Sequence, residues 1–225
     1  MSTIVAIRSE IIEDLEKYGV SDDSVLDPEL IEDKIVSARL ADFDKFITKG
    51  LPLEGFYQTI NNITLSCHKD TRQVGTLVFT DKTTYYQADL PPLVSNIGWK
   101  NIKYFGVHGY DKNLNRLDLT EFATRKGARY TSEEPIYSVI GDILIAKHIP
   151  VGLTFALMVA ILADPRTAPD WDNETSDFPT PSEMAIKIMV KNSITQTPGV
   201  PDLVNDAQRA LAQPSEKQPK GQQEE

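Results

Sequence analysis

The chain opens with two stretches in which apolar side chains recur every three or four positions, the spacing of an amphipathic helix. The first stripe comprises Ile4, Ile7, Ile11, Leu15 and Tyr18. Gly19 is predicted to end this helix, because glycine tolerates the left-handed geometry of a helix end. The second stretch begins at Asp27-Pro28, a cap followed by a first-turn proline, and closes at Gly50. Together they predict a helical hairpin within residues 1–54.

Between residues 55 and 165 the apolar period falls to two, which is typical of strands. Gly141-Asp142 separates two apolar runs and predicts a hairpin with a type II′ turn. Residues 153–162 form an almost unbroken run of apolar side chains, which favours a central strand covered on both faces. A buried helix is the alternative. Residues 118–124 are expected to form a helical turn.

Helix signals return after a loop rich in Pro and Asp. Thr180-Pro181-Ser182-Glu183 is predicted to be a capping box with proline at the first helical position. The buried face of this helix is expected to comprise Met184, Ile188 and Met189. A last short helix is predicted over residues 201–212, whereas residues 213–225 contain no apolar side chain and are predicted to be disordered.

These elements predict an α+β fold with two kinds of structure. The N-terminal helices (residues 1–54) and the C-terminal helices (residues 166–212) are expected to pair into one helical bundle. Residues 55–165 then form a β-rich insertion, and residues 213–225 a polar tail.

The composition is that of a folded protein: 225 residues, 40% hydrophobic and 25% charged. With 23 Lys and Arg against 33 Asp and Glu, the net charge of −10 argues against a protein that coats nucleic acid with its whole surface. The charge is uneven, because residues 1–50 hold 12 acids and 6 bases, whereas residues 55–165 hold 10 acids and 11 bases.

Basic residues gather in one part of the β-rich region. They are Lys100, Lys103, Lys112, Arg116, Arg125, Lys126 and Arg129. Such a region can face DNA or complement an acidic surface in an end-to-end stack, so these residues are candidates for an interface or a DNA channel. Ordinary solvated surface charge is the alternative explanation.

The sequence predicts a soluble protein that stays in the compartment where it is made. Its longest uncharged apolar stretch, residues 151–163, is shorter than the about 20 residues of a membrane-spanning helix. Charged residues such as Arg8 and Glu10 stand where a signal peptide has its apolar core. The one cysteine, Cys67, cannot form an internal disulfide.

The reactive side chains in the sequence form no pattern that predicts a catalytic residue, a metal site or a cofactor site. Cys67 and His68 are adjacent and would point to opposite faces of a strand, while His108 and His148 have no partner at ligand spacing. Cys67 is expected to be a small core residue.

Other chemical signals are equally weak. The carboxylates available for acid–base work are Asp111, Asp118, Glu121, Glu133 and Glu134, and such residues are usually surface charges. The Gly106-x-x-Gly109 sequence lacks the third glycine of a dinucleotide loop. Tyr104, Phe105 and Tyr110 near Lys100 and Lys103 suggest a stacking surface for single strands, but aromatic pairs in strands are more often core.

Several short sequences, taken in order, resemble one protein family. They are Asp27-Pro28 with Ile31, Ile35 and Ala38-Arg39; Asn101-Ile102-Lys103-Tyr104-Phe105-Gly106; Arg116-x-Asp118-Leu119-x-x-Phe122; Lys126-Gly127-x-x-Tyr130; Pro135-Ile136-Tyr137; Ala163-Asp164-Pro165; Pro181-Ser182; and Asn205-Asp206-Ala207. Over residues 1–212 this series resembles the head-to-tail connector (adaptor or ring) proteins of short-tailed bacteriophages, above all those of crAss-like phages.

The resemblance implies a structural role and no enzymatic activity. Such proteins form a dodecameric ring beneath the phage portal, extend the channel through which double-stranded DNA passes, and carry the next tail component. It implies a virion protein assembled in the bacterial cytoplasm, with itself, the portal and the next tail component as partners and no membrane. The alternatives are a small phage hydrolase that uses Asp and Glu, and a glycan- or receptor-binding β module.

Overall fold

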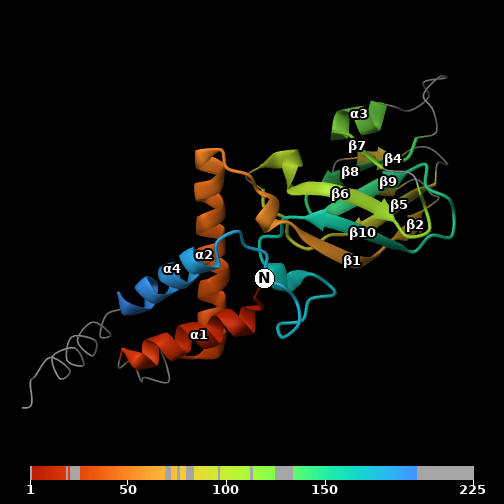
Figure 1. The fold of residues 1–225 in the computed structure, drawn as a ribbon. Coiled ribbons are helices and arrows are strands. Elements are labelled where there is room, and N and C mark those ends of the chain that lie inside the picture. Colours follow the sequence, from red (N-terminus) through yellow and green to blue (C-terminus); the bar gives the residue numbers. More distant parts are fainter. Residues whose placement is uncertain are drawn as a thin grey trace, which may run out of the picture. The chain divides into compact units, whose positions relative to one another are not determined.

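The computed structural model describes residues 2–18, 20, 26–68, 72–74, 77–79, 84–95, 97–111, 114–124 and 134–196. Its internal contacts divide the chain into two units (Figure 1). Among the described residues, the helical unit comprises residues 2–42 and 182–196, and the sheet unit comprises Phe43–Pro181.

Helix α1 (Ile4–Lys17) opens the helical unit and buries Ile4, Ile7, Ile11 and Leu15, as the sequence pattern predicts. The Thr3 hydroxyl caps the helix by accepting a hydrogen bond from the Ala6 amide at 3.2 Å. Tyr18 does not continue the buried stripe, because it follows the helix and is 57% exposed. Gly19, the predicted helix end, lies outside the described residues.

Helix α2 (Pro28–Lys49) begins at the predicted proline. The Asp27 carboxylate accepts a hydrogen bond from the Glu29 amide at 3.1 Å, which satisfies a free donor at the helix start. Gly50 follows the helix with φ of 64°, the left-handed geometry expected of a helix end. From Phe43 onward α2 belongs to the sheet unit, where the Phe43 and Phe46 rings meet Phe56 edge-on with ring centres 5.2 Å apart.

Helix α4 (Glu183–Thr195) does not begin with the predicted capping box. The helix begins at Glu183 after Ser182, so neither Thr180 nor Pro181 has its predicted position, and Ser182 makes no side-chain capping bond. The Glu183 carboxylate accepts a hydrogen bond from Lys187 at 2.6 Å. This bond directs the carboxylate along the helix toward the following turn.

The predicted buried face of α4 is also wrong. The helix buries Ile186, Val190 and Ile194, whereas Met184 is 66% exposed and Ile188 is 48% exposed. Both sets of residues fit the helical period, so the period alone does not select between them. The side that packs against α1 settles the choice.

Ion pairs join the helices of this unit. Lys191 of α4 pairs with Asp14 of α1 at 2.8 Å, and Lys187 pairs with Glu10 of α1, so the two helices lie side by side (Figure 1). Arg8 of α1 pairs with Glu32 of α2 at 2.6 Å. The pairs of Lys187 and Lys191 with α1 fix which side of α4 faces α1.

A three-stranded antiparallel sheet lies in the sheet unit. Its strands are β1 (Gln58–Thr64), β10 (Phe155–Ala160) and β6 (Ile102–Val107), in the order β1-β10-β6. Strand β10 is central, as predicted from its apolar run. Its burial alternates, however: Ala156, Met158 and Ala160 are buried, whereas Phe155 is 47% exposed. The expectation that both faces are covered is therefore wrong within the described residues.

A five-stranded sheet has the order β2-β5-β9-β8-β7. Its strands are β2 (Ser66–His68), β5 (Tyr85–Asp89), β9 (Ile143–Lys147), β8 (Ile136–Ile140) and β7 (Asn115–Arg116), of which only the β7–β8 pair is parallel. Strands β8 and β9 form the predicted hairpin, with Ile140 opposite Ile143 and Gly141 at φ of 58°. Asp142 does not share the positive φ, which matches the predicted turn type.

Short elements complete the sheet unit. They are the two-stranded ribbon of β3 (Arg72–Val74) and β4 (Leu77–Phe79), the 3-10 helices η1 (Glu54–Phe56), η2 (Gly98–Asn101) and η3 (Pro165–Thr167), and α3 (Leu119–Thr124). Helix α3 confirms the predicted helical turn, and the Asp118 carboxylate caps it by accepting a hydrogen bond from the Glu121 amide at 2.8 Å.

The two larger sheets share one buried core. It includes Ile60 of β1, Phe105 of β6 and Met158 of β10 together with Tyr86 of β5 and Leu144 of β9. The other face of the five-stranded sheet carries a second cluster, Tyr85, Ile136 and Ile145, which Phe122 of α3 completes. The sheet unit therefore stacks the three-stranded sheet, the five-stranded sheet and α3 as successive layers.

The structure is α+β, but it is not the predicted helical bundle of terminal helix pairs. The described residues contain four helices, and one of these, α3, belongs to the sheet unit. Eight strands in two sheets line the larger core, and the loops between the strands contribute further buried apolar side chains such as Leu65, Leu90 and Leu162. The predicted helix over residues 201–212 and the tail over residues 213–225 lie outside the described residues.

Candidate functional site

The structure describes three of the basic residues predicted for an interface or DNA channel: Lys100, Lys103 and Arg116. The others, Lys112, Arg125, Lys126 and Arg129, lie outside the described residues. Lys100 and Lys103 are exposed and stand where η2 leads into β6. The pairing of β6 with β10 shifts by one residue at Lys103, between the pairs Tyr104–Val159 and Ile102–Ala160, so Lys103 occupies a β-bulge.

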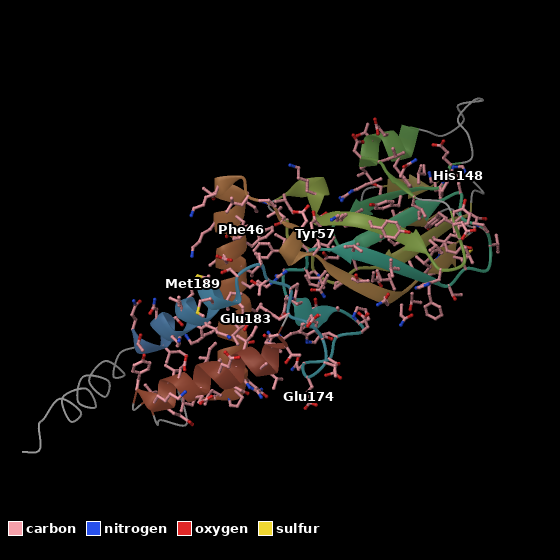
Figure 2. The ribbon with its side chains drawn as sticks, in the orientation of Figure 1. Phe46, Tyr57, His148, Glu174, Glu183 and Met189 are labelled. Atoms are coloured by element: carbon pink, nitrogen blue, oxygen red, sulfur yellow. The ribbon has the colours of Figure 1, made fainter. Side chains whose placement is uncertain are left out.

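Tyr57 positions this pair of lysines. The Tyr57 side chain is labelled in Figure 2. Its hydroxyl donates a hydrogen bond to the Lys100 carbonyl at 2.8 Å, and the Lys103 ammonium lies 5.4 Å from the centre of its ring. Burial, followed by the charge of Glu54, raises the pKa of the Tyr57 hydroxyl above its usual value. Tyr57 therefore stays neutral and acts as a donor and an aromatic support.

Arg116 has a different role from the two lysines. It is about half-buried, and its guanidinium donates a hydrogen bond to the Asn101 side chain at 3.0 Å. Burial lowers the pKa of this guanidinium, and burial raises the pKa of the Tyr137 hydroxyl despite the opposing charge of Arg116. Arg116 thus ties strand β7 to the start of β6 inside the sheet unit.

An apolar surface lies on the side of the three-stranded sheet that faces away from the core. We call the residues Tyr104, Phe155, Leu157 and Val159 the outer face. Tyr104 is 41% exposed and Phe155 is 47% exposed, while Leu157 and Val159 are half-buried. Sequence reasoning missed this surface because it assigned Tyr104 and Phe105 together to the core; alternation along β6 separates them, since only Phe105 is buried.

The reactive residues singled out from the sequence are spread over the sheet unit. Cys67 is exposed, so the expectation of a core cysteine is wrong. His68 stacks on Tyr85 with ring centres 5.3 Å apart, His108 is exposed, and His148 follows β9 with φ of 62° (Figure 2). Within the part of the chain that the structure describes, no three His, Cys, Asp or Glu side chains gather as metal ligands.

Of the carboxylates considered for acid–base work, Asp118 is engaged in capping α3. Asp111, Glu121 and Glu134 are exposed, and Glu133 lies outside the described residues.

An open hollow of about 380 Å³ lies between β1 and the loop after η3. Tyr57, Trp171, Asp170 and Asp177 are among its lining residues. The Asp170 carboxylate accepts hydrogen bonds from the backbone and side-chain nitrogens of Asn61 at 3.1 and 2.9 Å. These bonds tie the loop to β1, which is a structural use of that carboxylate.

A second open hollow of about 450 Å³ lies beside β1, β2 and β5. Asn62, Thr64, His68, Gln87 and Asp89 give it a polar lining. Asn62 has φ of 59° where the pairing of β1 with β10 shifts, so a β-bulge shapes this hollow.

Comparisons with known proteins give no family assignment: no protein-family model matches the chain, and no curated protein matches it. Among the described residues, no helix has the length and apolar character needed to cross a membrane.

Proposed function

We propose that this protein is a structural component of a phage neck. Copies of the chain form a dodecameric ring that joins the portal to the tail and surrounds the passage of double-stranded DNA. The proposal combines the sequence resemblance over residues 1–212 with one structural observation. That observation is the apolar outer face of the three-stranded sheet, with Tyr104 and Phe155 exposed to solvent.

An apolar sheet face favours a role in assembly. Clusters of exposed apolar side chains on soluble proteins mark surfaces that meet a partner, whereas single exposed residues need no explanation. The outer face is a cluster, because Tyr104 and Val159 are directly opposite on neighbouring strands and Phe155 continues the same face of β10. Lys100 and Lys103 provide a charged edge beside it.

The charge distribution also fits a ring. A closed ring uses heterologous contacts, in which one surface of a subunit meets a different surface of its neighbour. The excess of acids in residues 1–50 and the local bases of the β-rich region allow unlike surfaces to attract. The net charge of −10 keeps the rest of the surface from adhering to DNA in transit.

The hydrolase alternative has weaker support in the geometry. It requires two carboxylates available to a substrate in one cleft. In the hollow that Asp170 and Asp177 line, the Oδ2 atom of Asp170 accepts both hydrogen bonds from Asn61, which gives that oxygen a structural role.

Mass spectrometry and electron microscopy of purified virions test the proposal. We expect the polypeptide in the virion at one fixed stoichiometry relative to the portal, and a ring of density for it in the neck. Virions without the polypeptide, or an isolated subunit that turns over a small molecule, would overturn the proposal.

A further inference from the structure

Helix α4 has apolar side chains on two sides. One side carries Ile186, Val190 and Ile194, which are buried in the helical unit. The other carries Met184 and Ile188, which are four residues apart and exposed. Because successive residues of an α-helix are about 100° apart, Ile188 lies about 160° around the axis from Ile186. We call Met184 and Ile188 the outer stripe of α4. Figure 2 labels Met189, the residue that follows Ile188 on this helix.

The outer stripe is held in place by ion pairs. Lys187 bridges Glu10 of α1 and Glu183 of its own helix, and Lys191 pairs with Asp14 at 2.8 Å. The Lys187 side chain is only 11% exposed. Turning α4 to bury Met184 and Ile188 would therefore break these pairs and expose Ile186 and Val190, so the stripe stays available to a partner.

The outer face of the three-stranded sheet is a matching surface. A helix that presents apolar residues four apart commonly covers the apolar face of a sheet. Tyr104 and Phe155 stand out from β6 and β10, with the half-buried Leu157 and Val159 between them. Such a surface can receive the Met184 and Ile188 side chains.

The charges beside the two surfaces are complementary. Helix α1, which is fastened to α4, exposes Glu13 and Glu16, of which Glu13 also pairs with Lys17 of the same helix at 2.9 Å. The sheet face is flanked by the exposed Lys100 and Lys103. Opposite charges around an apolar contact steer association and fix the orientation of the partners.

We infer that the outer stripe of α4 in one copy of this chain docks on the outer face of the three-stranded sheet in a second copy. The inference rests on the proposed ring function and names the two surfaces that would form its subunit contact. The contact is heterologous, so each copy offers one surface to the neighbour on either side.

Mixing two variants of the full chain tests this contact. Phe155→Glu blocks the sheet surface, Ile188→Glu blocks the helix surface, and Leu51→Glu is a matched control at an exposed apolar position outside both. Sedimentation velocity over a concentration series should show self-association of the wild-type chain and of the control. Each blocked variant should associate about thirtyfold more weakly, because a charge is placed in an apolar contact.

The mixture gives the decisive result. Phe155→Glu chains keep their α4 stripe and Ile188→Glu chains keep their sheet face, so an equal mixture should form dimers and nothing larger. If only one of the two substitutions weakens association, or if the mixture stays monomeric, the inference is overturned. A wild-type chain that is monomeric at every concentration also overturns it.

Disulfide trapping gives a readout that does not depend on the blocking charges. In a Cys67→Ser background, chains with Phe155→Cys and chains with Ile188→Cys are mixed and oxidised. A cross-link between the two kinds of chain supports the contact, and its absence contradicts it. Rings that still form when both surfaces are blocked in one chain by Phe155→Glu and Ile188→Glu would overturn this contact and leave the neck function standing. Virions that lack the chain would overturn the neck function.

Discussion

Tyr104 lies across Gly106, two residues further along the same strand, so closely that a Cβ on the glycine would come within 2.4 Å of the tyrosine hydroxyl oxygen. The glycine thus lets the ring lie along β6 on the outer face. The ring is 41% exposed, so it can move outward if the glycine is replaced.

Gly106→Ala should therefore change the surface more than the fold. The free energy of unfolding should fall by less than about 1 kcal/mol, because the displaced atoms belong to a side chain that can swing into solvent. Self-association should weaken, because the Tyr104 ring no longer lies along the sheet. Urea unfolding and sedimentation velocity measure the two effects.

The control is the same substitution in a Tyr104→Ala background, where the steric conflict is absent. There Gly106→Ala should have no further effect on association. An equal loss in both backgrounds would contradict the assigned role of the glycine.

Gly55→Ala should be more costly than Gly106→Ala. A Cβ on Gly55 would meet the Cβ of Pro181 at 2.8 Å and its Cα at 2.9 Å. Backbone and a rigid proline ring cannot swing aside, so we expect a loss of about 2 kcal/mol in unfolding free energy. Urea unfolding of the two variants checks the order, and a smaller loss at Gly55 than at Gly106 would refute it.

Acid should weaken the Lys191–Asp14 pair between α1 and α4 and the Lys187–Glu183 pair within α4. Hydrogen bonding and the charge of Lys191 lower the pKa of Asp14 below its usual 3.8, and hydrogen bonding by Lys187 lowers the pKa of Glu183 below its usual 4.5. A lowered folded-state pKa stabilises the fold above the unfolded value, and the stabilisation is lost as the pH falls through the folded value. Both pairs should be intact above pH 4.5 and should weaken below it.

A double variant tests this pH dependence. In Asp14→Asn with Glu183→Gln, neither side chain titrates, so the acid sensitivity of the helical unit should decrease. Helical circular dichroism followed from pH 6 to pH 2 provides the measurement. An unchanged acid transition in the double variant would assign the sensitivity to other groups.

Substitutions of Arg116 and of Lys103 should affect different properties. Replacing Arg116 should lower stability, and replacing Lys103 should weaken self-association. Arg116→Met leaves the buried Asn101 side chain without the guanidinium that donates to it at 3.0 Å, so unfolding should become easier by about 2 kcal/mol. Lys103→Met should change stability by less than about 0.5 kcal/mol and weaken self-association. Thermal unfolding and sedimentation velocity distinguish the two, and the reverse pattern would show that the roles are exchanged.

The sequence was sufficient for elements whose signal is local. The stripe of α1 as far as Leu15, the start of α2 at Pro28 and the hairpin at Gly141 each depend on a few neighbouring residues, and the structure has them where predicted. The central place of β10 also followed, because a long apolar run favours an inner strand.

The errors arose where the outcome depends on distant parts of the chain. The stripes of Ile186 and of Ile188 both fit a helix, and only the position of α1 decides which one is buried. Cys67 lies opposite the buried Tyr86, yet it is exposed because β2 is a short edge strand. The predicted bundle failed for the same reason, since local patterns do not say which elements share a core.

The candidate site was only partly accessible to sequence reasoning. The basic residues were identifiable by charge, but charge alone did not separate the exposed Lys103 from the half-buried Arg116. The outer face was detectable in principle from alternation, which places Tyr104 and Phe105 on opposite sides of β6. Its second member, Phe155, required the pairing of β10 with β6.

Electron cryo-microscopy of the virion whose genome carries this sequence is the most direct measurement. It should show identical copies of the polypeptide around the DNA channel, with Phe155 of each copy against Ile188 of the next. A neck built without this polypeptide would contradict the account.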